Sequence, residues 1–245
     1  MMNCGDRFPT TRWSAIAAAR STDQGQRVQA AEWIATFYWK PVYKYIRIQR
    51  HKDIEVAKDL TQGFFARAFE KDFFADYDPA KARFRTFMKT CVDHFVANED
   101  KAAHRIRRGG RLSIQSCDFD GAEEELQVAH PPVLNSPEDY FCQEWLRSLF
   151  SLSVEALRQD CRREGKELHY RIFARYDLDE NGTGRECSYA TLAEEFHVPV
   201  SQVTNYLAYA RRQFRRIVLE KLREMTANEE EYRMEARWVL GVDLP

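Results

Sequence analysis

Residues 188–222 contain two helical patterns separated by a short break, and this order limits the folds that the chain can adopt. The segment reads SYATLAEEFHVPVSQVTNYLAYARRQFRRIVLEKL. A short amphipathic helix, a break at HVP and a long helix follow one another as in a helix-turn-helix. Spacings of three and four place one set of apolar residues on a single side of the long helix: Val203, Leu207, Ala210, Phe214 and Ile217. We expect this side to pack inward.

The other side of the long helix carries amides, hydroxyls and cations. Amides and hydroxyls near the start of such a helix can reach base edges, and arginines further along suit phosphates. An ordinary helical hairpin with a solvated basic face is the alternative interpretation. The candidate contact residues are Ser201, Gln202, Thr204, Asn205, Tyr209, Arg212 and Arg216.

Helical patterns also dominate residues 1–110, which we expect to form one domain. In residues 53–71, apolar side chains recur at three and four, at Ala57, Leu60, Phe64 and Ala68. A second set of side chains on the same helix points elsewhere, and it consists of Asp59, Gln62 and Arg67.

The rest of the chain divides at changes in composition. Residues 111–135 lose the periodicity and gain acids and a Pro-Pro pair, so they predict an acidic linker. Ser136 as a cap with Pro137 in the first turn begins a second domain, 136–225. In residues 226–245, Asn228 and Glu231 start an extra helix. The predicted fold class is therefore all-α, with two helical domains joined by an acidic linker.

The net charge of −1 hides a segregation of charge along the chain. Residues 1–110 hold 20 Lys or Arg and 13 Asp or Glu, a net of +7. Residues 111–184 hold 8 and 15, a net of −7. Residues 185–225 hold 7 and 5. A basic block, an acidic middle and a weakly basic block suggest contacts with a polyanion at two separate places.

Cysteine spacing favours reduced thiols and no metal. None of the six cysteines forms a CxxC pair, and Cys91 with His94 lacks two further ligands, so no zinc site is expected. We expect no cofactor, no membrane span and a cytoplasmic location. An enzyme acting on nucleic acid is disfavoured, because the sequence offers no phosphate loop, no metal-spaced carboxylates and no nucleophile with a base.

One loop resembles a calcium site without completing it. Asp177, Asp179, Asn181 and Gly182 occupy positions 1, 3, 5 and 6 of an EF-hand loop. The twelfth position, which should supply a bidentate carboxylate, is Ser188. We therefore expect a polar loop that does not bind calcium.

The order of these parts resembles an RNA polymerase sigma factor of the extracytoplasmic-function type of the sigma-70 family, over about residues 12–222. ATFYWKPVYKYIRIQR is similar to the first helix of sigma region 2, and DIEVAKDLTQGFFARAFEK to its polymerase-binding helix. RFRTFMKTCVDHFVANEDKAAHRIRR resembles the promoter-melting helix. YATLAEEFHVPVSQVTNYLAYARR resembles the DNA-reading motif of sigma region 4. The resemblance implies transcription initiation at promoters, without a catalytic residue in this chain.

The resemblance also assigns partners and residues. Asp59, Gln62 and Arg67 would contact the clamp of the largest subunit of core RNA polymerase. The alternative for Asp59, which the agreement of the flanking motifs disfavours, is a helix first-turn acid on a solvated face. The loop 72–82 would capture a flipped base. The minus-ten element of promoter DNA would meet Lys81, Arg83, Phe84, Arg85, Phe87, Lys89, His94, Asn98, Lys101 and Arg105.

Some of these assignments leave alternatives open. Phe84 and Phe87 are as well placed for the core of the domain as for contact with bases. The minus-thirty-five element would meet the helix-turn-helix residues already named. The acidic linker as a whole would enter the RNA channel of the polymerase, although any single acid fits a soluble tether as well. These acids are Asp118, Asp120, Glu123, Glu124 and Glu125. A stand-alone helix-turn-helix regulator is the alternative function, and an anti-sigma factor or another regulator stays open as a further partner.

Overall fold

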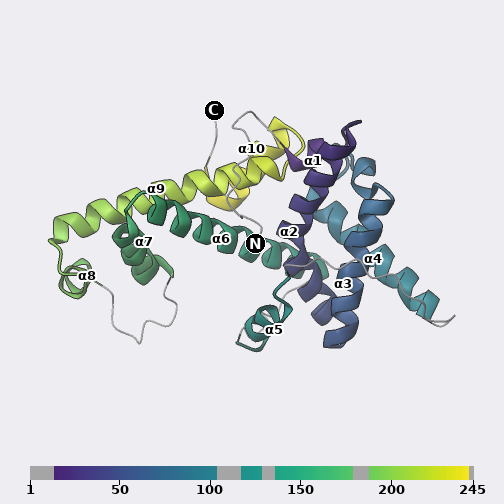
Figure 1. The fold of residues 1–245 in the computed structure, drawn as a ribbon, viewed down its shortest axis with the longest axis horizontal. Helices are drawn as coiled ribbons and strands as arrows, with labels where there is room; N and C mark the ends of the chain where they lie inside the picture. Colours follow the sequence, from purple (N-terminus) through teal and green to yellow (C-terminus); the bar gives the residue numbers. More distant parts are fainter. Residues whose placement is uncertain (1–13, 104–116, 129–135, 179–187, 243–245) are drawn as a thin grey trace. The chain divides into compact units, whose positions relative to one another are not determined.

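The computed structural model describes residues 14–103, 117–128, 136–178 and 188–242 (Figure 1). No strand occurs within these ranges, which confirms the predicted all-α class. The elements are α1 Ala15–Ala18, α2 Gln24–Gln49, α3 Ile54–Glu70, η1 Phe73–Asp76, α4 Phe84–Ala103, α5 Phe119–Val128, α6 Pro137–Arg163, α7 Glu167–Phe173, η2 Ala174–Leu178, α8 Tyr189–Glu195, α9 Val200–Glu224 and α10 Glu229–Leu240.

The contacts divide the chain into two compact units. The first comprises residues 1–148 and 222–245, and the second comprises residues 149–221. These bounds differ from the expected break at 110 and the expected second domain from 136. They differ because α5, the start of α6 and α10 pack with the N-terminal helices. Long-range ion pairs and aromatic contacts produce this packing, and neither leaves a local signal in the sequence.

Side-chain caps set the starts of several helices. The carboxylate of Asp53 accepts a hydrogen bond from the Val56 amide at 2.9 Å and starts α3. Ser136 accepts from the Asp139 amide at 3.1 Å, directly before Pro137 opens α6, as predicted. Asn228 accepts from the Glu231 amide at 2.9 Å, which confirms the expected start of α10.

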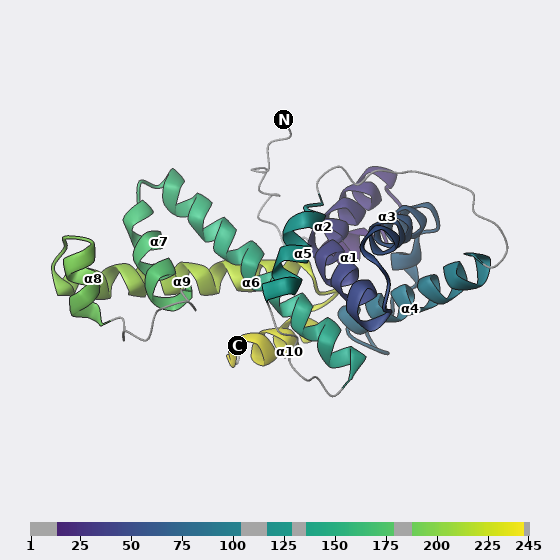
Figure 2. The same cartoon turned by 90° about the horizontal axis from the view of Figure 1, so that it is seen from below.

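The core of the first unit is rich in aromatic rings, and Figure 2 shows its helices from a second direction. Phe64 and Phe65 of α3 are fully buried. The ring of Phe84 at the start of α4 packs edge-on against Tyr38 of α2 at 5.6 Å and against Tyr77 at 5.0 Å between centroids. The phenylalanine-rich stretch of α3 therefore builds this core, as its spacing predicts.

Most of the described part of the acidic segment is helical. Residues predicted as a linker form α5, which packs on α2. Phe119 is buried there between Trp39 and Tyr43, at 5.4 and 4.9 Å between ring centroids. Residues 111–116 and 129–135 of the predicted linker lie outside the described residues.

The second unit has its own core. Residues from α6, α7, α8 and α9 meet there, and all but one of the five apolar positions predicted on the long helix are fully buried. The exception, Phe214, is partly buried and packs against this core. The buried members are Leu157, Cys161, Ile172, Phe173, Leu192, Val203, Leu207, Ala210 and Ile217.

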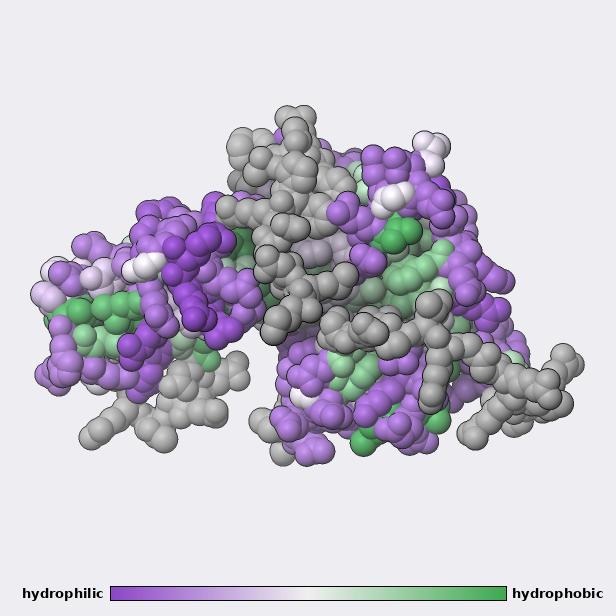
Figure 3. All heavy atoms as spheres, viewed as in Figure 1, coloured by the Kyte–Doolittle hydropathy of each residue, from purple (hydrophilic) through white to green (hydrophobic). Residues whose placement is uncertain are grey.

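Hydrophilic residues cover much of each unit on the face drawn in Figure 3, with hydrophobic patches between them. Within the described ranges, no helix combines the length and the apolar character that crossing a membrane requires.

Candidate nucleic-acid interface

A short helix, a tight turn and a long helix follow one another in the second unit. Helix α8 ends at Glu195 with Phe196 as its C-cap, His197 takes the left-handed conformation with φ 52°, and α9 begins after Pro199. Histidine tolerates this region better than bulky or β-branched residues do. The Val198 amide donates to the Ala193 carbonyl at 3.0 Å and closes the turn. The expected helix, break and helix are therefore observed.

The first turns of α9 present polar side chains to solvent. Ser201, Gln202, Thr204 and Asn205 are all exposed, and none of them belongs to the buried cluster of the unit. The Tyr206 hydroxyl donates to Oε1 of Gln202 at 3.0 Å and so orients that amide. These groups can donate to and accept from base edges.

Tyr209 is held within the protein. Its hydroxyl accepts a hydrogen bond from Nζ of Lys166 at 3.0 Å and donates to Oε2 of Glu164 at 2.7 Å. The Lys166 ammonium also lies 4.2 Å from the centre of the Tyr209 ring. Both hydroxyl partners belong to the chain itself, so the Tyr209 hydroxyl, for which the sequence predicted a contact with bases, is engaged within its own unit.

The arginines of α9 fall into two groups. Arg212 and Arg215 are exposed, so their guanidinium groups are accessible to phosphate oxygens. Arg211 pairs with both carboxylate oxygens of Asp177, at 2.8 and 2.9 Å. Arg216, predicted to face DNA, instead bonds groups of its own unit, with 2.6 Å to Glu220, 2.9 Å to Gln213 and 3.4 Å to Asp160.

The pair between Arg211 and Asp177 also bears on the calcium-like loop. Asp177 would be the first calcium ligand, and both of its oxygens are occupied by a guanidinium. Residues 179–187, which are positions 3 to 11 of this loop, lie outside the described residues. Among the described residues, no group of three or more His, Cys, Asp or Glu is arranged to hold a metal ion.

Two of the basic residues predicted to hold phosphates on α4 are buried. Arg85 and Lys89 are each 8% exposed. Arg85 pairs with the buried carboxylate of Glu235 in α10, and Lys89 pairs with Asp93 at 3.0 Å and with Glu138 at 2.5 Å. Burial works against the charged form of Lys89, but hydrogen bonds to Glu138 and Asp93 raise its pKa. Both cations are thus neutralised inside the first unit, which corrects the expectation that they face DNA.

The two phenylalanines of α4 have different places. Phe84 is 1% exposed and belongs to the core, the alternative that its spacing left open. Phe87 is partly exposed and lines a cavity.

Other predicted residues of this region remain at the surface. Lys81, His94, Asn98 and Lys101 are exposed. Arg83 is partly exposed, with its Nε 3.5 Å from Glu235. Arg105 lies outside the described residues.

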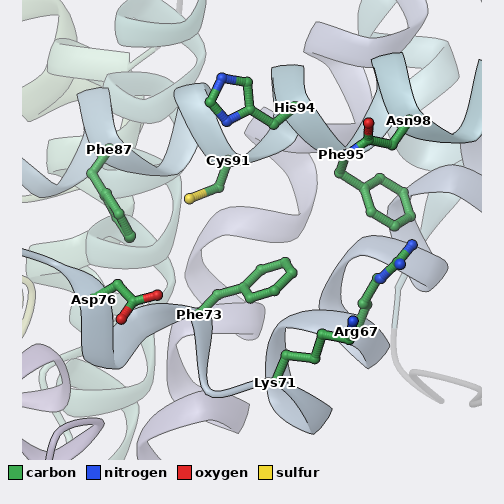
Figure 4. A pocket seen from close by; sticks show the side chains of 9 residues that line it. All are labelled: Arg67, Lys71, Phe73, Asp76, Phe87, Cys91, His94, Phe95 and Asn98. Atoms are coloured by element: carbon green, nitrogen blue, oxygen red, sulfur yellow. The ribbon is translucent and has the colours of Figure 1, made fainter.

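A cavity of about 320 Å³ opens between the end of α3, η1 and α4 (Figure 4). Phe73 and Asp76 lie across it from Phe87 and Cys91. Its volume is at the lower end of the range of roughly 300 to 1,000 Å³ that is common for ligand sites. The full lining is Arg67, Lys71, Phe73, Asp76, Phe87, Cys91, His94, Phe95 and Asn98.

The chemistry of this cavity suits a planar polar ring. Aromatic rings supply stacking surfaces, His94 and Asn98 supply hydrogen-bonding groups, and Arg67 and Lys71 supply positive charge. Phe73, Asp76 and Phe95 were not singled out from the sequence, although the first two fall in the predicted base-capturing loop 72–82.

Cys91 in this cavity is a poor nucleophile. Burial, together with the nearby Asp76 carboxylate, raises the pKa of the Cys91 thiol to about 11. The thiolate is the reactive form of cysteine, so Cys91 is mostly unreactive at neutral pH.

The predicted polymerase-binding residues lie on the outer side of α3. Asp59 is exposed and Gln62 is partly exposed, off the face that buries Ala57 and Phe64. Arg67 pairs with Glu99 of α4 at 3.0 Å. Asp59 and Gln62 are therefore available to a partner, and Arg67 is partly engaged within the unit.

Gly63 of α3 lies beside the ring of Phe95. A Cβ added at Gly63 would lie 3.4 Å from Cζ of Phe95, which is an ordinary van der Waals contact.

The acids predicted to enter an RNA channel are largely paired with the first unit. Glu123 binds Arg47, Glu125 binds Lys40 and Lys44, and Asp120 lies 3.4 Å from Lys58. Asp118 accepts from the Gly121 amide at 2.9 Å and caps α5. Of the five, Glu124 is exposed and forms no ion pair within the part of the chain that the structure describes.

In comparisons of the chain with protein-family models, with curated proteins and with solved structures, nothing matched.

Proposed function

We propose that this chain is a sigma-type initiation factor of the cytoplasm, which binds core RNA polymerase and directs it to promoters by DNA recognition and strand opening. The observation that carries the proposal is the presence of two separate surfaces suited to nucleic acid in one chain. One is the exposed polar start of α9, followed by Arg212 and Arg215. The other is the aromatic and cationic cavity beside α4.

The two surfaces suit different forms of DNA. The α9 surface offers amides and hydroxyls in the first turns of the helix. Recognition helices that read duplex DNA in the major groove place their base-contacting residues there. The cavity offers stacking rings and hydrogen-bonding groups, which suit a base removed from its stack. A protein that both locates a promoter and opens it needs both capacities, whereas a simple repressor needs only the first.

The outer side of α3 supplies the polymerase contact in this proposal. Asp59 and Gln62 lie off the buried face, so their replacement leaves the core intact. We expect the double variant Asp59→Ala/Gln62→Ala to bind core polymerase at least about tenfold more weakly than the wild type, which corresponds to about 1.4 kcal/mol.

Glu70→Ala is the matched control, because Glu70 is an exposed acid at the end of the same helix. Binding is measured by co-purification with core polymerase and by fluorescence titration. Unchanged affinity in the double variant would refute the assignment of α3 as the polymerase contact.

A stand-alone helix-turn-helix regulator is the second candidate. The burial of Arg85 and Lys89 favours it, because these cations are not available to hold promoter phosphates near the opening site. Specific DNA binding of full strength in the absence of polymerase supports this candidate. Binding that becomes specific only with core polymerase supports the sigma-type proposal.

A further inference from the structure

Helix α2 carries a row of cations that face one way. Lys40, Lys44 and Arg47 recur at four and three residues, so they lie on one side of the helix. Acids of α5 cover them. Nζ of Lys40 lies 2.8 Å from Glu125, and Nζ of Lys44 lies 2.7 Å from the other oxygen of the same carboxylate.

Glu123 makes the remaining polar contacts of α5 with this row. Its carboxylate accepts two hydrogen bonds from Arg47, at 2.6 and 3.1 Å, and one from the Tyr43 hydroxyl at 2.7 Å. Hydrogen bonds from Arg47, opposed by burial, lower the pKa of Glu123. The carboxylate is therefore charged at neutral pH and held by three donors.

An aromatic slot lies beside the cations. The ring of Phe119 enters between Trp39 and Tyr43 and packs edge-on against both. Ala122, one turn further along α5, is fully buried. The surface of α2 thus recognises a ring followed, four and six residues later, by two carboxylates.

The contacts that dock α5 on the first unit are few, and some of them are exposed to solvent. The helix covers only Phe119–Val128, and a helix of this length is marginal in water without docking. Glu125 keeps half of its side chain exposed, and Asp120 keeps 91%. Exposed ion pairs each contribute roughly 0 to 1 kcal/mol. Among the described residues of α5, the buried contacts are confined to Phe119, Ala122 and Glu123, so we expect the segment to open locally before the whole unit unfolds.

We propose that the α2 surface formed by Trp39, Lys40, Tyr43, Lys44 and Arg47 is a binding site for an acidic amphipathic helix of a partner protein, and that α5 is an exchangeable occupant. Charge complementarity and the aromatic slot define the class of partner. A partner helix carries a ring and two carboxylates in the spacing of α5. This inference is independent of the proposed role in transcription.

A partner helix has to compete with α5, which is covalently tethered next to the same surface of α2. A covalently linked segment acts at an effective concentration of the order of millimolar. A partner helix therefore displaces α5 only if it binds more tightly or has additional contacts. The docked α5 protects the basic row from other acidic segments until such a partner is present.

The first test uses the unmodified chain. We expect hydrogen exchange to show the amides of α5 opening at least about a hundredfold more readily than those of α2, in native buffer. Exchange of α5 amides only through global unfolding would overturn the proposal, since a permanently docked helix is no exchangeable occupant.

The second test measures binding in trans. A fluorescein-labelled peptide of residues 118–128 is titrated with the full chain and with the variant Phe119→Ala/Glu123→Gln/Glu125→Gln. We expect the variant to bind the peptide at least about tenfold more tightly than the wild type, because its own α5 no longer fills the site. A peptide with Glu124→Gln is the control and keeps its affinity, since Glu124 is exposed.

Adding Lys40→Gln/Arg47→Gln to the variant should abolish peptide binding. Lys44 stays unchanged because it also pairs with the buried Glu144 at 3.1 Å. A variant with native circular dichroism that fails to bind the peptide would contradict the proposal. So would equal competition by an oligonucleotide of the same net charge, which would indicate a general polyanion surface. If the variant does not fold, the hydrogen-exchange result decides.

Discussion

Arg85 of α4 and Glu235 of α10 form a buried ion pair, although 150 residues separate them in the sequence. The guanidinium carbon of Arg85 lies 5.1 Å from the centre of the Trp145 ring and 4.5 Å from that of Trp238. A buried charge needs a partner, and cation–π contacts add to its stabilisation. The pair thus ties the C-terminal helix to the N-terminal unit.

Breaking this pair should destabilise the first unit. We expect Glu235→Gln to lower the free energy of unfolding by about 3 to 5 kcal/mol, because it leaves the Arg85 cation buried without a counter-charge. Glu230→Gln, an exposed position on the same helix, should change it by less than about 0.5 kcal/mol. Urea denaturation measures both. Equal midpoints for the two variants would show that the pair carries no stability.

The readers of bases on α9 should be the exposed amides. We expect Asn205→Ala to reduce the preference for a selected promoter over scrambled DNA by about tenfold, since one good base contact contributes roughly 1 to 3 kcal/mol of discrimination. Tyr209→Phe should keep the preference, because the hydroxyl of Tyr209 bonds Lys166 and Glu164. Competition binding with core polymerase present measures both variants. A loss confined to Tyr209→Phe would reverse the assignment.

The exposed arginines of α9 should determine how binding depends on salt. We expect Arg212→Ala and Arg215→Ala each to reduce the slope of log K against log salt by about 0.9, the contribution of one phosphate. Arg211→Ala should change the slope less, because Arg211 is paired with Asp177. Titrations at several salt concentrations give the slopes. Three equal slopes would mean that the intramolecular pair does not withhold Arg211 from DNA.

Cys91 should react slowly with alkylating reagents. Its raised pKa, about 11 against an ordinary value of 9.0, lowers the thiolate fraction at pH 8 by about a hundredfold. The rate should therefore increase about tenfold for each pH unit from 7 to 10. Mass spectrometry of the Cys91 peptide after iodoacetamide treatment measures it, with urea-unfolded protein as the control. A native rate equal to the unfolded rate at pH 8 would place Cys91 in a polar, open environment.

Local patterns predicted the helices well and their long-range partners poorly. The apolar spacing of Val203, Leu207 and Ala210 defines a buried face within one helix, so periodicity is sufficient to find it. The pairing of Arg85 with Glu235 depends on how distant segments pack. In the sequence alone, the basic residues of α4 that become buried cannot be distinguished from those that stay exposed and accessible to DNA. Folding decides which cations remain available.

The acidic segment is a second case in which local features miss a long-range contact. Its acids and nearby prolines predicted a linker, whereas part of it docks on α2 as the helix α5. The buried position of Phe119 between Trp39 and Tyr43 requires contacts with α2 that no local pattern contains. The cavity beside α4 could not be predicted from local patterns either. It forms only where η1, which carries Phe73 and Asp76, packs near the part of α4 that carries His94 and Asn98.

In the proposed function, this chain gives core RNA polymerase its choice of promoter. Run-off transcription with purified core polymerase, on fragments of the genome that encodes the chain, distinguishes this function from DNA binding alone. We expect discrete transcripts that require the chain, start downstream of shared sequence elements and disappear with Asp59→Ala/Gln62→Ala. DNA binding by the chain without any chain-dependent transcript would contradict the account and leave a helix-turn-helix regulator in its place.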